Sequence, residues 1–106
     1  MTECLFSVTK KTTAYLTVSF YDKAGALQIP ATATYRIDDV GSGDQVRDTT
    51  NLTPATEIEI ILRPSDNVIL RGGNEKRRVT VTATYGVDDQ VVDEYVYGVV
   101  DLRKVT

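Results

Sequence analysis

Apolar and polar residues alternate with a period of two along most of this chain, which is the pattern of β-strands that bury one face. The alternation predicts strands over residues 14–21, 31–38, 57–62 and 78–85. Residues facing the interior are then Ala14, Leu16, Val18, Phe20, Ala31, Ala33, Tyr35, Ile37, Ile58, Ile60, Leu62, Val79, Val81, Ala83 and Tyr85. No stretch repeats its apolar residues every 3.6 positions, so essentially no helix is expected.

The two ends of the chain and its middle add further strands. A first strand is expected over Cys4, Phe6 and Val8, a short one around Val46, and a long last strand over residues 92–102. The register of the last strand is ambiguous, because Asp101 and Arg103 belong outside yet share the parity of Tyr95, Tyr97 and Val99. A β-bulge at Gly98 would switch the two faces midway.

Six or seven short strands in 106 residues predict an all-β fold, since each single-faced sheet must cover its apolar side with another layer. We expect an immunoglobulin-like or fibronectin type III-like sandwich of two antiparallel sheets, with residues 1–106 forming a single domain. The first and last strands would be its natural edges, open to the addition of a strand.

Three segments carry a resemblance to a known group of proteins. They are Tyr35-Arg36-Ile37-Asp38-Asp39, the stretch 51–60 that begins Asn51-Leu52-Thr53-Pro54, and residues 78–86 followed by Tyr95-Val96-Tyr97. These segments resemble small immunoglobulin-like proteins encoded in the structural-gene clusters of tailed phages and prophages. The resemblance implies a virion-associated decoration, connector or tail protein, whose partners are other structural proteins or copies of itself in a homo-oligomer.

The sequence also departs from better-known relatives of this fold. It lacks the paired cysteines and the core tryptophan of antibody-type domains. Leu52-Thr53-Pro54 matches the fibronectin type III pattern, but Ile58 stands where that pattern has a tyrosine.

Composition limits the available chemistry. The chain has no His, no Trp and one Cys, so it has no Ser-His-Asp or Cys-His catalytic group and no His-ligated metal site. A single Cys forms no intrachain disulfide. We therefore expect a non-enzymatic protein with no catalytic residues and no cofactor. A small hydrolase is the last of the alternatives, because no nucleophile with its base is found.

Charge and hydropathy bear on partners and location. Twelve basic against fifteen acidic residues give a formal charge of −3, so nucleic acid is not an expected partner. The basic residues Arg71, Lys76, Arg77 and Arg78 are expected at the end of the sandwich that holds Asp38 and Asp39, as exposed ion pairs worth little each. Residues 1–11 lack a signal-peptide pattern and no segment is apolar enough to span a membrane, which predicts cytoplasmic synthesis, no membrane contact, and a place in the virion if a phage encodes the chain.

Aspartates in turns are candidate calcium ligands. Asp22, Asp88 and Asp89 are expected in two turns at one end of the sandwich, where carboxylate oxygens could gather as Ca²⁺ requires. Aspartate is also common in turns because its side chain caps local backbone amides, and we favour this interpretation. No metal site is predicted.

Tyrosines on outward positions suggest a binding surface. Tyr15 and Tyr21 alternate with the inward residues of their strand, and Tyr95 or Tyr97 is expected to be exposed on the last strand. Exposed tyrosines are typical of protein interfaces. Carbohydrate- or surface-binding modules also use aromatic platforms, and this alternative stays open although the chain lacks tryptophan.

Overall fold

The computed structural model describes residues 4–21, 24–70, 73–86 and 89–100, and in these residues strands dominate. The strands are β1 (Cys4–Thr9), β2 (Ala14–Ser19), β3 (Thr32–Asp39), β4 (Gln45–Leu52), β5 (Glu57–Leu62), β6 (Glu75–Thr84) and β7 (Gln90–Val100). One short 3-10 helix, η1 (Pro64–Asn67), lies between β5 and β6. The all-β prediction is confirmed.

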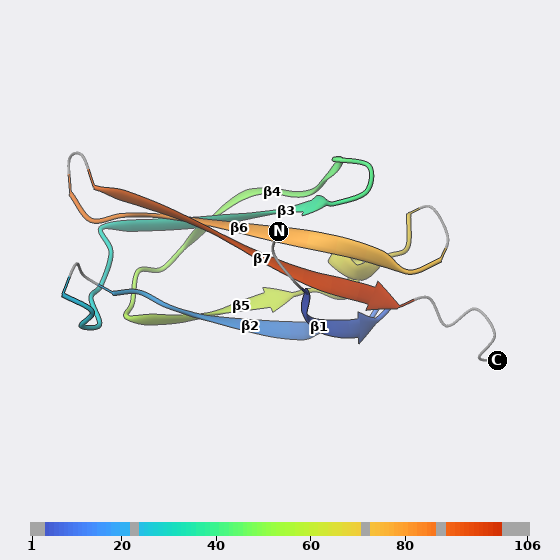
Figure 1. Cartoon of the computed structure of the whole chain (residues 1–106), viewed down its shortest axis with the longest axis horizontal. Coiled ribbons are helices and arrows are strands. Elements are labelled where there is room, and N and C mark those ends of the chain that lie inside the picture. The colour runs from blue at the N-terminus through green and yellow to red at the C-terminus, as the bar shows by residue number, and fades with distance from the viewer. Residues whose placement is uncertain (1–3, 22–23, 71–72, 87–88, 101–106) are drawn as a thin grey trace.

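The strands form two sheets that lie over one another as two layers (Figure 1). The large sheet has the order β1-β7-β6-β3-β4, and the small sheet pairs β2 with β5. A two-stranded sheet is too narrow to cover a five-stranded one, so the flanking strands of the large sheet lie beyond its cover.

Alternate residues of both sheets fill the space between the layers, as the period of two predicts. The burial pattern of β2 alternates from Ala14 to Val18, and that of β6 alternates along its whole length. The core comprises Ala14, Leu16, Val18, Phe20, Ala33, Tyr35, Ile37, Ile58, Ile60, Leu62, Val79, Val81, Ala83, Tyr97 and Val99. Ala31 is exposed and precedes β3, whereas Tyr85 packs against the core from a partly buried position.

One strand pair departs from the antiparallel arrangement that we expected. β1 runs parallel to β7, with Ser7 opposite Gly98 and Thr9 opposite Val100. The parallel direction follows from the chain path, because β1 must end where β2 begins in the other sheet, and β7 ends at that same end. β1 is therefore an edge strand, whereas β7 is an edge only where β1 does not flank it.

The bulge predicted at Gly98 is wrong. β7 pairs with β6 without a shift from Gln90 to Val99, and the irregularity lies instead in β1, between Cys4 and Ser7. A glycine suits position 98 for another reason. A Cβ atom added there would lie 2.9 Å from Oγ of Ser7. The glycine thus allows β1 to approach β7 closely. Asp101 and Arg103, which raised the conflict of register, lie outside the described residues.

Candidate protein-interaction surface

Large side chains with much apolar surface are exposed to solvent on the outer side of the small sheet and just beyond the end of β2. Tyr15 of β2 lies directly opposite Ile61 of β5, and Tyr21 forms an isolated bridge with Leu27 just beyond β2. Their exposed fractions are 59% for Tyr15, 38% for Ile61, 54% for Tyr21 and 56% for Leu27. We call these four residues the tyrosine face.

The tyrosine face results from the alternation of β2. Leu16 and Val18 are buried against the large sheet, so the residues between them point away from it. Thr17 and Ser19 on that outer side are paired with Glu59 and Glu57 of β5, which makes the middle of the face polar. Tyrosine offers a large apolar ring with a hydroxyl group at its tip, a combination that is enriched where proteins meet.

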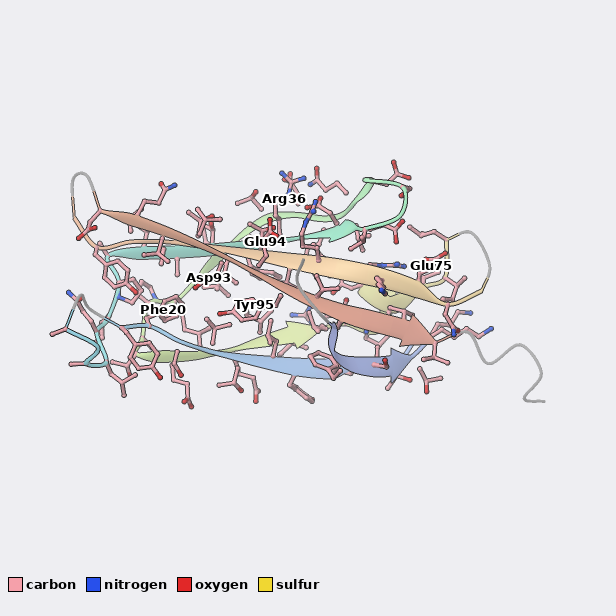
Figure 2. All side chains as sticks on the ribbon, in the orientation of Figure 1. Phe20, Arg36, Glu75, Asp93, Glu94 and Tyr95 are labelled. Atoms are coloured by element: carbon pink, nitrogen blue, oxygen red, sulfur yellow. The ribbon has the colours of Figure 1, made fainter. Side chains whose placement is uncertain are left out.

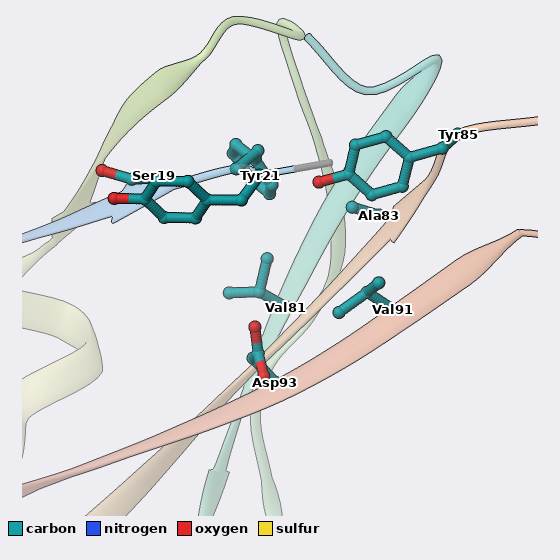
Figure 3. A pocket seen from close by; sticks show the side chains of 8 residues that line it. Ser19, Tyr21, Val81, Ala83, Tyr85, Val91 and Asp93 are labelled. Atoms are coloured by element: carbon teal, nitrogen blue, oxygen red, sulfur yellow. The ribbon is translucent and has the colours of Figure 1, made fainter. Parts of the chain in front are cut away.

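A groove of about 180 Å³ opens between β2 and the first half of β7. This volume exceeds that of a cavity of about 150 Å³ that holds benzene, so one aromatic or branched side chain would fit. Tyr85, Val91 and Asp93 point into the space between the two layers (Figure 3). The lining residues are Ser19, Phe20, Tyr21, Val81, Ala83, Tyr85, Val91 and Asp93.

The first half of β7 flanks this groove and extends beyond the cover of the small sheet. Val91 and Val92 are 44% and 52% exposed, and they lie near the start of β7, where it pairs with the end of β6. Among the described residues, β7 is bonded from Gln90 to Tyr95 on one side only, to β6, because β1 begins opposite Val96. This segment, 90–95, is called the free edge below.

Asp93 points from the free edge toward the small sheet, on the same side of β7 as Tyr95, whereas Glu94 points to the opposite side (Figure 2). The side chain of Asp93 forms no hydrogen bond or ion pair with any residue in the described part of the chain. Its negative charge still acts on the neighbouring tyrosines. Burial raises the pKa of Tyr95, and the charge of Asp93 raises it further. Burial and then Asp93 likewise raise the pKa of Tyr85.

The four tyrosines predicted to form an interface have different environments. Tyr15 and Tyr21 are exposed, Tyr95 is partly buried, and Tyr97 is 1% exposed. The expected exposure of Tyr97 is therefore wrong. Without a bulge in β7, Tyr97 keeps the inward parity of Val99, stacks on Phe6 with ring centroids 5.4 Å apart, and donates a hydrogen bond to Asn67. The role of the others in an interface stays a prediction.

Of the three calcium candidates, Asp22 and Asp88 lie outside the described residues. Asp89 is exposed, and its main-chain carbonyl accepts a hydrogen bond from the amide of Tyr85. In the part of the chain that is described, no group of three potential ligand side chains could hold a metal ion.

Sequence reasoning missed a buried ionic cluster at the end of the sandwich that holds the β3–β4 connection. Nη1 of Arg77 lies 2.7 Å from Oδ1 of Asp39 and 2.9 Å from Oε1 of Glu75, and all three side chains are buried. The structure confirms that Asp39 lies near a basic residue, Arg77. The prediction that such ion pairs are exposed is wrong for this one, because both side chains are buried. Arg71 lies outside the described residues.

The alternation of β6 already contained the signal for this cluster. Glu75 and Arg77 share the inward parity of Val79, and the burial pattern of β6 continues through them. Nη2 of Arg77 also donates to the carbonyl of Val68 at 2.6 Å, and Oδ2 of Asp39 accepts from both N and Oγ of Ser42. The cluster therefore joins β3, β6 and the segment after η1, and its contacts indicate a structural role.

In the described residues, no helix has the length and apolar character needed to cross a membrane. Comparison with family models, with curated proteins and with solved structures found no match.

Proposed function

We propose that this chain is a non-catalytic protein-binding domain that contacts its partner through the tyrosine face. The observation that carries the proposal is the pairing of Tyr15 with Ile61 on the outer side of a two-stranded sheet, where both side chains are exposed to solvent. An outer sheet face of a monomer is usually polar. Covering Tyr15, Tyr21, Leu27 and Ile61 with a partner would remove exposed apolar area from solvent.

The strand order supports an immunoglobulin-like topology for this domain. The order β7-β6-β3-β4 corresponds to the G-F-C-C′ sheet of variable-type immunoglobulin domains, and β2 with β5 corresponds to their B and E strands. Tyr97 donates to Asn67 in the connection between β5 and β6 at 2.8 Å. This bond fastens β7 to the connection between β5 and β6.

The resemblance to immunoglobulin-like proteins of phage structural-gene clusters suggests in which kind of particle this protein-binding domain works. We propose a virion-associated component, such as a decoration, connector or tail-associated protein, that is made in the cytoplasm and assembled into a particle. Its partners would be other structural proteins or further copies of this chain. The exposed tyrosine face and the free edge support such a role because assembly needs surfaces rather than catalytic groups.

Co-expression with structural proteins encoded beside this gene, followed by size-exclusion chromatography with light scattering, tests the proposal. We expect a defined complex or a ring-forming or trimeric assembly with the wild-type chain, and its loss in a Tyr15→Ser/Ile61→Ser variant. Thr17→Ser, on the same outer face between the two apolar ends, is the matched control. A chain that stays monomeric and binds none of these proteins would contradict the proposal.

A carbohydrate- or surface-binding module is the second candidate, and the groove between β2 and β7 favours it. Tyr21 and Tyr85 supply rings, and Asp93 supplies a carboxylate that accepts hydrogen bonds from sugar hydroxyl groups. Binding on a glycan array that a Tyr21→Ser variant abolishes would support this candidate. Binding that is unaffected by Tyr21→Ser, or absent from the array, would exclude this site.

A further inference from the structure

Along the free edge of β7, beside the groove, main-chain groups have no partner strand among the described residues. Edge strands present N–H and C=O groups that can pair with a strand of another chain. The edge is long enough for such pairing, since strands are usually 3–10 residues long. A strand added to this edge would point every second side chain toward the groove. These side chains would lie next to Val91 and Asp93.

We infer that the free edge binds an extended segment of another protein that carries an apolar residue and, two positions away, a Lys or Arg on the same face. This inference rests on the proposed function, protein binding, and adds a second contact to the tyrosine face. It follows from the spacing of Val91 and Asp93, which lie two residues apart and face the same groove. The apolar side chain would lie opposite Val91, and the cation opposite Asp93.

Charge selects a basic segment over other occupants. The described residues that line the groove include one carboxylate and no basic side chain, and the side chain of Asp93 forms no hydrogen bond or ion pair with any of the described residues. Glu94 adds a second negative charge on the outer side of the same edge, and the whole chain carries a formal charge of −3. A cation opposite Asp93 would form a hydrogen-bonded ion pair next to apolar side chains, where such a bond is stronger than on an open surface.

The same charges argue against a second copy of this chain on the free edge. Pairing two such edges would bring two copies each of Asp93 and Glu94 into one short ladder, and like charges across strands are destabilising. Inward-pointing charges on an edge also protect proteins from unwanted pairing with themselves. Asp93 can therefore have two effects: its charge repels a second copy of this acidic chain and attracts a basic segment.

The groove on the other side of the small sheet differs in charge. It lies between β4 and β5 and is lined by Glu59 and Arg63, among others, so both signs are present there. Arg47 on β4 is bound to Asp66 at 2.9 Å. The edge at β4 therefore lacks the single-sign charge that makes the free edge selective.

Three synthetic peptides of about nine residues test the inference on the full chain. The first alternates threonine with leucine and lysine, so that leucine and lysine share one face. The second has glutamate in place of lysine, and the third places leucine and lysine on opposite faces. Fluorescence anisotropy measures affinity, and amide hydrogen exchange locates the contact. We expect the first peptide to bind at least tenfold more tightly than the other two and to protect amides of residues 90–95.

Asp93→Asn preserves the shape of the side chain and removes its charge, and we expect it to weaken the first peptide roughly tenfold or more. Glu59→Gln removes an exposed charge from the small sheet and should leave binding unchanged. Equal binding of the lysine and glutamate peptides, protection at another edge, an unaffected Asp93→Asn variant, or no binding at millimolar peptide would each overturn the inference.

The failure of this inference can be told apart from that of the proposed function. A complex with a co-expressed structural protein that survives Asp93→Asn but is lost in Tyr15→Ser/Ile61→Ser would retain protein binding and reject the basic-segment site. Loss in both variants supports both contacts. No complex with any structural protein contradicts the proposed function, whatever the peptides do.

Discussion

Arg77 and Asp39 form an ion pair in which both side chains are fully buried, with Nη1 and Oδ1 2.7 Å apart. Glu75 is a second carboxylate on the same nitrogen, so one guanidinium group serves two acidic residues. Ion pairs on the surface contribute little to stability, but removing one member of a buried pair leaves an uncompensated charge in the protein interior.

Replacing Arg77 by Met should therefore lower the free energy of unfolding by about 3–5 kcal/mol. Urea unfolding followed by circular dichroism measures the loss. Arg36→Gln is the matched control, since Arg36 also binds an aspartate, Asp38, at 2.7 Å but its side chain is 44% exposed. The control should lose much less stability, and equal losses in the two variants would contradict the role given to burial.

Tyr97 should make stability depend on pH in the alkaline range. Burial raises the pKa of its hydroxyl group above the usual value of 10.0. The folded state then holds this proton more tightly than the unfolded chain, so its contribution is complete below about pH 10 and declines as pH rises further. Unfolding free energies measured from pH 8 to pH 11 should fall more steeply for the wild type than for Tyr97→Phe. Parallel curves would show that Tyr97 does not carry the effect.

The same variant should also lose stability at neutral pH. The hydroxyl group of Tyr97 donates to Oδ1 of Asn67, whose side chain is fully buried and whose Nδ2 donates to the carbonyl of Thr12. Tyr97→Phe leaves Oδ1 without its donor, at a cost of about 1–3 kcal/mol. Tyr15→Phe, on the exposed tyrosine face, is the control and should leave the unfolding midpoint unchanged. A loss below about 0.5 kcal/mol in Tyr97→Phe would contradict the importance of this bond.

Gly98 and Ser7 should behave as a coupled pair. A methyl group at position 98 would lie 2.9 Å from Oγ of Ser7 but 3.6 Å from its Cβ, an ordinary contact distance. Gly98→Ala should cost about 0.5–1.5 kcal/mol, because Ser7 must leave its rotamer or β1 must shift. In a Ser7→Ala background the same change should cost less, and a double-mutant cycle of unfolding free energies measures the difference. Additive effects would show that the two residues do not press on each other.

Asp66 should stabilise the connection between β5 and β6. Its carboxylate accepts from Nε of Arg47 and from the main-chain amide of Arg63, both at 2.9 Å, and the residue is 2% exposed. Asp66→Ala should cost about 2–3 kcal/mol through the loss of these charge-assisted bonds. Asp66→Asn retains an acceptor for the amide of Arg63 and should lose less stability. Thermal unfolding of both variants checks the order, and a larger loss in Asp66→Asn would contradict it.

Single-sequence reasoning predicted the strands well where alternation was strict. β2, β5 and β6 bury the residues that the period of two assigned to the interior, because a strand with one apolar face has only one stable orientation against a second layer. The same rule would have placed Arg77 inside, but its charge suggested the surface. Only the presence of Asp39 and Glu75 beside it explains why an arginine is tolerated there.

The sequence by itself thus determined the all-β character, the inward faces of most strands and the exposure of Tyr15 and Tyr21, since these depend on local alternation. The tertiary structure alone decided the parallel pairing of β1 with β7, the burial of Tyr97 and the free edge beside Asp93. These features depend on which distant strands become neighbours and on the unequal widths of the two sheets. No local pattern encodes either property, because both arise only when segments far apart in the chain pack together.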